Sequence, residues 1–190
     1  MLTQSKYSEI AAFAKQIRIE TIRQMMTFGK GHAGGSMSIA DIVAVLYGEV
    51  MHYDPKNPKD PDRDWLICSK GHAGPAIYSA LALKGFFPME WLQTLNQSHT
   101  NLPSHCDRNK TPGIDVTTGS LGQGLGVACG VAISNKMDGR DSHVFCIIGD
   151  GESQEGQIWE AVMLAAHRKL DNLIVFVDSN KLQIDGTCEQ

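Results

Sequence analysis

The sequence predicts an α/β fold in which a parallel β-sheet is flanked by helices. Residues 144–148 and 173–177 are continuously apolar and rich in β-favouring side chains, as expected of strands buried on both faces of a parallel sheet. Segments with helical spacing alternate with these runs, which is typical of βαβ units. The chain has 190 residues, 42% hydrophobic and 20% charged, and this suits one domain over residues 1–190.

The first part of the chain predicts two helices and one strand. Residues 8–28 carry apolar side chains at mostly helical spacing among charged ones, so we expect an amphipathic helix. Ser38 begins a Ser-Ile-Ala-Asp sequence typical of an N-cap, which predicts a second helix through residue 47. Residues 54–64 hold three prolines among charges and predict an irregular connection. Residues 65–69 then predict the first core strand.

The middle of the chain predicts two helices separated by a long loop. Pro75 suits the first turn of a helix over residues 76–86. Residues 96–118 are polar and lack periodicity, and a loop of that length inside a compact domain is usually functional. Residues 119–137 predict a helix of small residues. Its glycine-rich start at residues 119–124 is well placed to meet a ligand.

The turn between the two apolar runs predicts a pocket for a magnesium-bound diphosphate. Asp150 follows the first run, at the carboxyl end of a strand, where open α/β sheets bind ligands. Gly149 and Gly151 leave room for phosphate oxygens, and a helix over residues 158–169 would direct its N–H groups at the anion. Asn180, after the second run, offers another oxygen ligand of the kind that Mg²⁺ prefers. A simple Gly-Asp-Gly turn is the alternative interpretation.

Three histidines are candidates for binding or proton transfer. The pentapeptide Lys-Gly-His-Ala-Gly occurs at residues 30–34 and 70–74, and each copy brings a histidine, His32 or His72, to the start of a predicted helix. His105 lies in the long polar loop. Neutral imidazole both donates and accepts hydrogen bonds. Sequence spacing does not show whether the three converge, so incidental loop histidines remain the alternative.

Composition and charge exclude several classes of function. The net charge of −4, the pI near 5.9 and the scattered basic residues argue against a nucleic-acid partner. Five cysteines without a Cys-x-x-Cys spacing indicate neither a disulfide framework nor a zinc site. No basic segment followed by a long apolar one stands at the N-terminus, and no stretch approaches the ~18 apolar residues that span a bilayer. We therefore expect no membrane partner and a cytoplasmic location.

Five segments, taken together and in this order, resemble the N-terminal, diphosphate-binding part of transketolase. They are residues 31–36, 69–73, 117–124, 149–156 and 180–186. A lone Gly-Asp-Gly would also fit other thiamine-diphosphate enzymes. The two Gly-His segments and the Thr-Thr-Gly-Ser-Leu-Gly-Gln-Gly loop narrow the resemblance to transketolase and its near relatives. The resemblance implies the thiamine-diphosphate-binding fold.

The resemblance also implies an activity and its cofactors. A two-carbon ketol unit would pass from a ketose phosphate to an aldose phosphate, with thiamine diphosphate and Mg²⁺ bound. The implied metal ligands are Asp150, the Asn180 side chain and the Leu182 carbonyl. The implied cofactor contacts are His72, Gly119, Ser120, Leu121, Gly151 and Asn180. His32 and His105 would line the substrate channel, hydrogen-bond the ketose hydroxyls and relay protons, so the implied catalytic residues are His32, His72, His105 and Glu155.

Glu155 has two interpretations. In the family the matching glutamate meets, across a subunit interface, the glutamate that activates the cofactor, and that activating residue is not in this chain. A carboxylate near a helix start is also stabilised by the helix dipole without any function.

Two departures from the usual pattern imply a split enzyme. Ser120 replaces the usual proline, and Gly35-Ser36 replaces the more common small-residue and proline pattern, as in two-subunit transketolases. The expected partner is a separate subunit with the pyrimidine-binding and C-terminal domains, assembled as a dimer of heterodimers. The family's diphosphate domain continues beyond residue 190, so we expect a truncated chain whose sheet is incomplete at the C-terminal end. A 1-deoxy-xylulose-phosphate synthase-like enzyme and a non-catalytic assembly module of the same fold stay open as alternatives.

Overall fold

The protein contains a three-stranded parallel sheet of strand order β1-β2-β3. The computed structural model describes residues 2–184 and 186–189. The strands are β1 (Trp65–Cys68), β2 (Val144–Gly149) and β3 (Leu173–Asp178). Ile67 pairs with Cys146, and Cys146 pairs with Val175. The predicted parallel sheet is confirmed, and each strand differs from its prediction only at its last residue.

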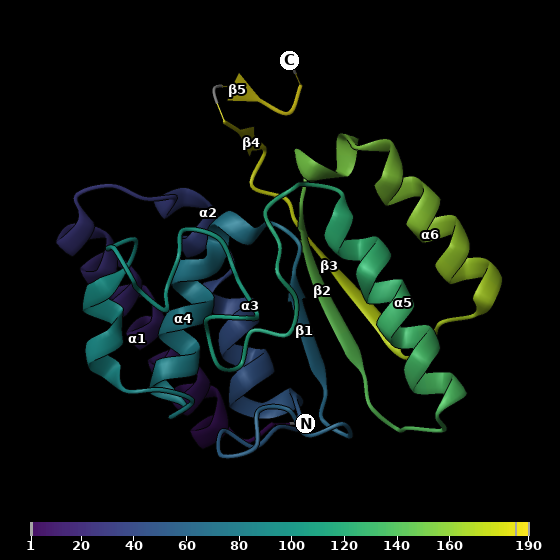
Figure 1. The fold of residues 1–190 in the computed structure, drawn as a ribbon, viewed down its shortest axis with the longest axis horizontal. Coiled ribbons are helices and arrows are strands. Elements are labelled where there is room, and N and C mark those ends of the chain that lie inside the picture. The colour runs from purple at the N-terminus through teal and green to yellow at the C-terminus, as the bar shows by residue number, and fades with distance from the viewer. Residues whose placement is uncertain (1, 185, 190) are drawn as a thin grey trace.

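Helices cover both faces of this sheet (Figure 1). They are α1 (Gln4–Phe28), α2 (Ala33–Met37), α3 (Ala40–Val45), α4 (Gly74–Leu83), α5 (Gln123–Met137) and α6 (Gly156–Arg168). Shorter elements are a π-helical turn (Leu46–Val50), the 3₁₀ turns Gly71–Ala73, Met89–Thr94 and Glu152–Gln154, and the hairpin strands β4 (Leu182–Gln183) and β5 (Gly186–Thr187). Figure 1 shows α1, α3 and α4 on one face and α5 and α6 on the other.

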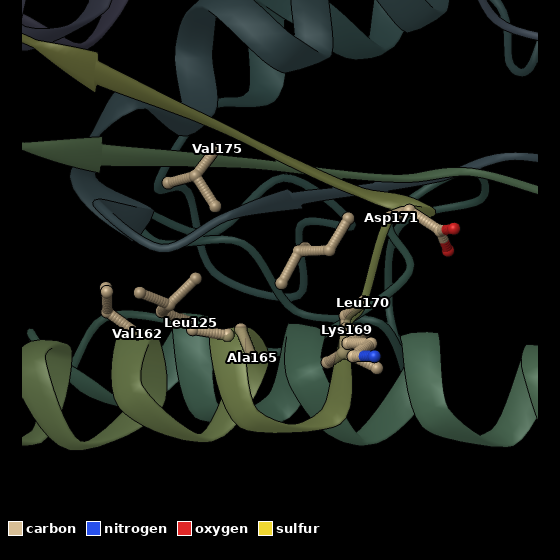
Figure 2. A pocket seen from close by; sticks show the side chains of 9 residues that line it. Leu125, Val162, Ala165, Lys169, Leu170, Asp171 and Val175 are labelled. Atoms are coloured by element: carbon tan, nitrogen blue, oxygen red, sulfur yellow. The ribbon is translucent and has the colours of Figure 1, made fainter.

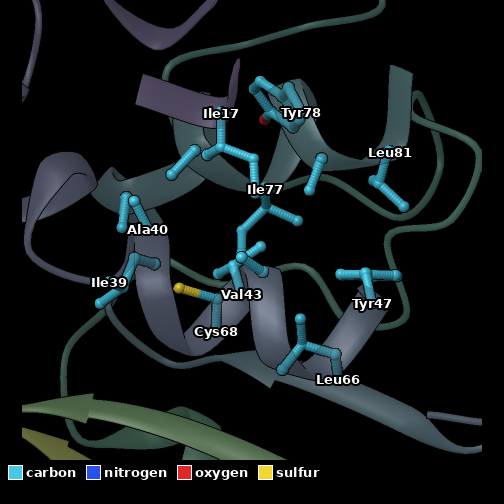
Figure 3. Close-up of a cluster of buried hydrophobic side chains, with 14 of the residues drawn as sticks. Ile17, Ile39, Ala40, Val43, Tyr47, Leu66, Cys68, Ile77, Tyr78 and Leu81 are labelled. Atoms are coloured by element: carbon cyan, nitrogen blue, oxygen red, sulfur yellow. The ribbon is translucent and has the colours of Figure 1, made fainter. Parts of the chain in front are cut away.

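Strand side chains alternate between two apolar clusters, one on each face of the sheet. The cluster shared with α1, α3 and α4 includes Ile17, Ile39, Val43, Leu66, Cys68, Ile77, Tyr78 and Leu81, all of which are labelled in Figure 3. The cluster shared with α5 and α6 includes Ile67, Leu125, Ala128, Val144, Cys146, Ile148 and Ile158. Both faces of β1 and β2 are therefore buried, which explains why these two strands are apolar without alternation, whereas Val175 and Val177 of β3 are exposed.

Two of the predicted helix starts are wrong in the first part of the chain. Helix α1 begins at Gln4 rather than residue 8, because Thr3 caps it by accepting a hydrogen bond from the Lys6 N–H at 3.3 Å. Ser38 is not an N-cap. Its hydroxyl donates to the Asp178 carboxylate at 2.6 Å, and α3 begins at Ala40 without a side-chain cap.

The helix predicted from residue 119 begins later, at Gln123. Gly119 and Gly122 have φ angles of +145° and +86°, which are outside the helical region, and they keep residues 119–122 in a turn. Helix α6 likewise begins at Gly156 rather than residue 158. The residue before α6, Glu155, is extended with a φ of −69° and a ψ of 131°.

One segment passes the length and hydropathy test for a membrane span, contrary to the expectation from the sequence. Residues Ala33–Val50 have a mean hydropathy of 1.2 over 18 residues. This is weak evidence, because the core helix of a soluble protein passes the same test. Ile39, Ala40, Val43 and Ala44 are fully buried in the cluster with α1 and α4, so in this structure the segment is part of the core.

An apolar groove runs between β3 and the helices on its face (Figure 2). It has a volume of 550 Å³, and its lining includes Leu125, Val162, Ala165, Leu170, Leu173 and Val175. Within the described residues β3 pairs with β2 alone. None of the predicted site residues lines the groove. Asp185, which belongs to the last of the five segments, lies outside the described residues.

Candidate diphosphate and metal site

The carboxyl ends of β2 and β3 bring the predicted metal ligands to one edge of the sheet. Gly149 at the end of β2 pairs with Asp178 at the end of β3. The N–H of Asp150 then donates to the Asp178 carbonyl at 3.2 Å, and Asn180 follows two residues after Asp178. Because ligands of open α/β sheets bind at this edge, the predicted position of the site agrees with the topology.

Two backbone N–H groups fix the carboxylate of Asp150. Its Oδ1 accepts from Gly151 N at 3.0 Å, and its Oδ2 accepts from Lys181 N at 2.5 Å. Lys181 has a φ of +61°, a left-handed conformation that is uncommon and strained for a residue with a side chain. This turn directs the Lys181 N–H at Asp150 and joins the ends of β2 and β3.

Asn180 and Leu182 lie on the same turn as Lys181. The Asn180 Oδ1 accepts from Leu182 N at 2.9 Å. The Asp150 carboxylate, an Asn180 amide oxygen and a Leu182 carbonyl are hard oxygen donors, and their chemistry fits Mg²⁺. Among the described residues, no group of three or more His, Cys, Asp and Glu is placed to hold a metal. A magnesium ion here would therefore depend on amide, carbonyl and phosphate oxygens in addition to Asp150.

The structure brings the three candidate histidines together. The ring centroids of His32 and His72 are 5.2 Å apart, those of His32 and His105 are 5.7 Å apart, and those of His72 and His105 are 6.5 Å apart. Burial, followed by the charge of Lys70 and the two other histidines, lowers the pKa of His72 to about 4. Burial and then His32 lower the pKa of His105 as well. His72 is therefore a neutral imidazole at neutral pH, able to donate and accept hydrogen bonds.

The long loop 96–118 is held in place by hydrogen bonds that deliver His105. Tyr78 Oη donates to the Pro103 carbonyl at 2.9 Å. On the other side of His105, the Thr118 N–H donates to the Cys106 carbonyl at 3.0 Å, and the Thr118 hydroxyl donates to the Cys68 carbonyl at 2.7 Å at the end of β1. These contacts hold the loop on both sides of His105; that the loop is functional stays a prediction.

Two of the predicted cofactor-contacting residues are glycines that leave room for neighbouring side chains. A Cβ added to Gly119 would lie 3.1 Å from the His105 ring, and one added to Gly151 would lie 2.9 Å from the Cβ of Gln183. Ser120 and Leu121 lie between Gly119 and Gly122 in the turn before α5. The N–H of Gly122 donates to the Glu152 carboxylate at 2.9 Å. The Gly122 N–H at the start of α5 therefore already has an anionic partner.

Glu155 precedes the first residue of α6 and is exposed. Its side chain makes no capping hydrogen bond to the helix. Its Cβ would lie 3.0 Å from a Cβ added to Gly122, so it adjoins the turn before α5. No ring or hydrogen-bond contact joins it to the histidines in the described part of the chain. Its exposed position is compatible with either interpretation of Glu155.

Sequence reasoning missed a group of buried charged residues next to the site. They are Lys70, Glu152 and Asp178. Lys70 and Asp178 form an ion pair of 2.5 Å, and Glu152 accepts hydrogen bonds from three backbone or hydroxyl donors. Each of the three either lies next to a motif residue in the sequence or stands at the end of a strand. That position was the signal from which their place near the site could have been predicted.

Gly35 offers a test of the histidine arrangement with a neighbouring control. A Cβ at Gly35 would lie 2.9 Å from the Cδ2 and Nε2 atoms of His72, whereas a Cβ at Gly34, in the same short helix, would meet nothing within 4 Å. Gly35→Ala is expected to lose about 1–3 kcal/mol by overpacking, while Gly34→Ala gains up to about 1 kcal/mol of helix propensity. Thermal denaturation measures both, and NMR of the His72 ring should shift in the first variant alone. Equal melting temperatures for the two variants would contradict the arrangement.

Comparison with known proteins identifies the family. The family model for the thiamine diphosphate binding domain of transketolase matches residues 10–190. The chain is 55% identical over 177 residues to the 6-deoxy-6-sulfo-D-fructose transketolase subunit SqwG of Clostridium sp. (strain MSTE9), a match that covers 93% of this chain and 64% of that protein. It is 42% identical over 181 residues to an apulose-4-phosphate transketolase subunit of Actinobacillus succinogenes, with 95% and 66% covered. The chain thus spans about two thirds of the length of these relatives.

Solved structures agree with this assignment. The transketolase from Leishmania mexicana superposes with a TM-score of 0.90 at 36% identity, over 95% of this chain and 28% of that one. The transketolase from Campylobacter jejuni superposes with a TM-score of 0.90 at 33% identity, over 99% of this chain and 30% of that one. A family match from residue 10 onward, on a fold shared with solved transketolases, shows that this chain belongs to the transketolase family and contains its thiamine-diphosphate-binding domain.

Proposed function

We propose that the chain is the N-terminal subunit of a split transketolase, which transfers a two-carbon ketol unit from a ketose phosphate to an aldose phosphate with thiamine diphosphate and Mg²⁺. The proposal depends on one observation: Asp150 and Asn180 lie at the same edge of the sheet, together with three converging histidines. The hydrogen bonds of Asp150 to the Asp178 carbonyl and to the Lys181 N–H connect the segments that carry the two residues. Relatives named as separate transketolase subunits support the split organisation.

In this proposal each motif residue of the chain has a role in binding. Asp150, the Asn180 side chain and the Leu182 carbonyl hold Mg²⁺, and the backbone of Gly119, Ser120, Leu121 and Gly151 approaches the diphosphate with His72. Thiamine diphosphate supplies the stabilised carbanion when it is bound, so the protein orients the reactants and provides electrostatic stabilisation. His32 and His105 bind the sugar hydroxyls and hold or move their protons.

The partner in this proposal is a subunit with the pyrimidine-binding and C-terminal domains, in a dimer of heterodimers. Glu155 then lies at the interface, where its exposed carboxylate can meet the partner's activating glutamate. We further propose a cytoplasmic enzyme that acts on small sugar phosphates.

Complementation tests this function directly. The isolated chain is expected to show no ketol transfer, and transfer should appear when a C-terminal transketolase subunit encoded in the same genome is added. The substrate panel should include a sulfonated ketose as well as ketose phosphates, because one relative is named for a sulfofructose. Robust turnover by the chain alone would refute the need for a partner. Turnover of pyruvate with glyceraldehyde phosphate would instead indicate a 1-deoxy-xylulose-phosphate synthase-like enzyme.

A further inference from the structure

Asp178 contacts both of the proposed side-chain ligands for Mg²⁺. Its backbone carbonyl accepts from the Asp150 N–H at 3.2 Å, and its Oδ2 lies 3.4 Å from Nδ2 of Asn180. A carboxylate only accepts hydrogen bonds, so the NH₂ side of the Asn180 amide faces Asp178. The amide oxygen then faces away from Asp178, where it accepts from Leu182 N. Asp178 and the Leu182 N–H thereby favour the same orientation of the Asn180 amide.

Lys70 and Ser38 hold the Asp178 carboxylate from other segments of the chain. The Lys70 ammonium lies 2.5 Å from Asp178 Oδ2, and the Ser38 hydroxyl donates to the same oxygen at 2.6 Å. The Lys70 side chain is 2% exposed. Its Nζ would lie 3.7 Å from a Cβ at Gly35, and its Cδ would lie 3.9 Å from a Cβ at Gly149. The lysine therefore passes beside the Gly-Asp-Gly turn and joins the ends of β1 and β3 to the first glycine-rich segment.

Stability alone does not explain why such a pair is buried. The cost of removing two charges from water offsets most of their attraction, and apolar or neutral replacements of both partners are often as stable as the ion pair. Residues that orient metal ligands, in contrast, are commonly charged or hydrogen-bonded side chains in contact with those ligands. The contact of the Asp178 carboxylate with the Asn180 amide is of this second kind, whereas the contact with Asp150 is made by the backbone.

We propose that Lys70 and Asp178 are positioning residues that orient Asn180 for the metal-bound diphosphate. The proposal rests on the proposed function, because it assumes that Asp150 and Asn180 are the ligands. Neither residue of the pair is required to touch the metal. The pair acts by keeping the amide oxygen of Asn180 turned toward the ligand site and the ends of β2 and β3 in register.

Single and double variants separate positioning from stability. Lys70→Met leaves an unpaired buried carboxylate and Asp178→Asn leaves an unpaired buried ammonium, so each single variant should melt about 10 °C lower. The double variant K70M/D178N buries no charge and should recover most of that loss. The amide that D178N introduces is able to donate to Asn180 Oδ1, so the double variant loses the preference that the carboxylate imposes and leaves only the Leu182 N–H to orient the Asn180 amide.

Binding of Mn²⁺ in the presence of inorganic pyrophosphate, followed by EPR on the full chain, gives the decisive measurement. The double variant should bind Mn²⁺ roughly 10- to 100-fold more weakly than the wild type in spite of its recovered melting temperature. The matched control is the buried pair Arg63–Asp115, which lies at the amino end of β1. Arg63→Met should lower the melting temperature without changing Mn²⁺ affinity.

Each remaining outcome bears on the proposal. If the double variant or Asp178→Asn bound Mn²⁺ with wild-type affinity, the positioning role would be overturned. Lys70 and Asp178 would then contribute to the structure alone. A wild-type chain that binds no Mn²⁺ with pyrophosphate, in a preparation that melts cooperatively, would overturn the proposed metal site itself and the positioning role with it. The wild-type measurement therefore distinguishes failure of the proposed function from failure of this inference.

Discussion

Asp150→Ala is expected to weaken the binding of thiamine diphosphate with Mg²⁺ by more than about 100-fold, since loss of a supporting residue alone commonly costs 10- to 100-fold. Asp150 is the anionic member of the three proposed ligands. Its carboxylate also accepts from Gly151 N and Lys181 N, so its removal frees the turn that carries Asn180 and Leu182. Charge neutralisation and loss of geometry therefore act in the same direction.

Titration calorimetry of the chain with its partner subunit measures this effect. Asp150→Asn keeps the shape and one acceptor oxygen, so it should retain more of the turn while losing the charge, and its affinity should lie between those of the wild type and Asp150→Ala. Asp171→Ala is the control, because Asp171 has a side chain 85% exposed and lies before the amino end of β3. Equal binding by Asp150→Ala and the wild type would favour a non-catalytic assembly module.

The sheet could be predicted from the sequence because burial on both faces leaves a strong signal. Strands β1 and β2 are apolar runs packed between two helical layers, and β3 is an apolar run although Val175 and Val177 are exposed, so the limits of each strand follow from where polar residues begin. Helix starts were less predictable. The start of α5 depends on the positive φ angles at Gly119 and Gly122, where an added Cβ would also crowd His105 and Glu155. A glycine in the sequence permits such an angle without requiring it.

The site could be predicted in part. Asp150 and Asn180 follow successive strands of a parallel sheet, so their proximity follows from topology. The convergence of the histidines depends on long-range contacts such as the hydrogen bond of Tyr78 to Pro103, which no local pattern encodes. The roles of Lys70, Asp178 and Glu152 were missed because charged residues usually indicate exposed surface.

Glu152 is a further buried charged residue near the site whose loss should lower stability. It is 3% exposed, and no ion-pair partner is found for it in the described part of the chain. Its Oε1 accepts from the Ser69 hydroxyl and from Gly122 N, and its Oε2 accepts from Gly149 N at 3.0 Å. These donors belong to the end of β1, the start of α5 and the end of β2. One carboxylate therefore connects three of the segments that form the proposed cofactor site.

Glu152→Ala is expected to lower the melting temperature by about 6–12 °C, because three buried donors lose their partner at a cost of at least about 1 kcal/mol each. Glu152→Gln keeps Oε1 for Ser69 and Gly122 but places an NH₂ group opposite the Gly149 N–H, so about a third of that loss is expected. Glu9→Ala, at an exposed position of α1 with 64% side-chain exposure, should change the melting temperature little. Differential scanning calorimetry distinguishes the three variants. If Glu152→Ala and Glu9→Ala had the same melting temperature, the hydrogen bonds of Glu152 would make no net contribution to stability. The close approach of the three segments would then have to depend on packing, such as that of Gly124 against Ser69.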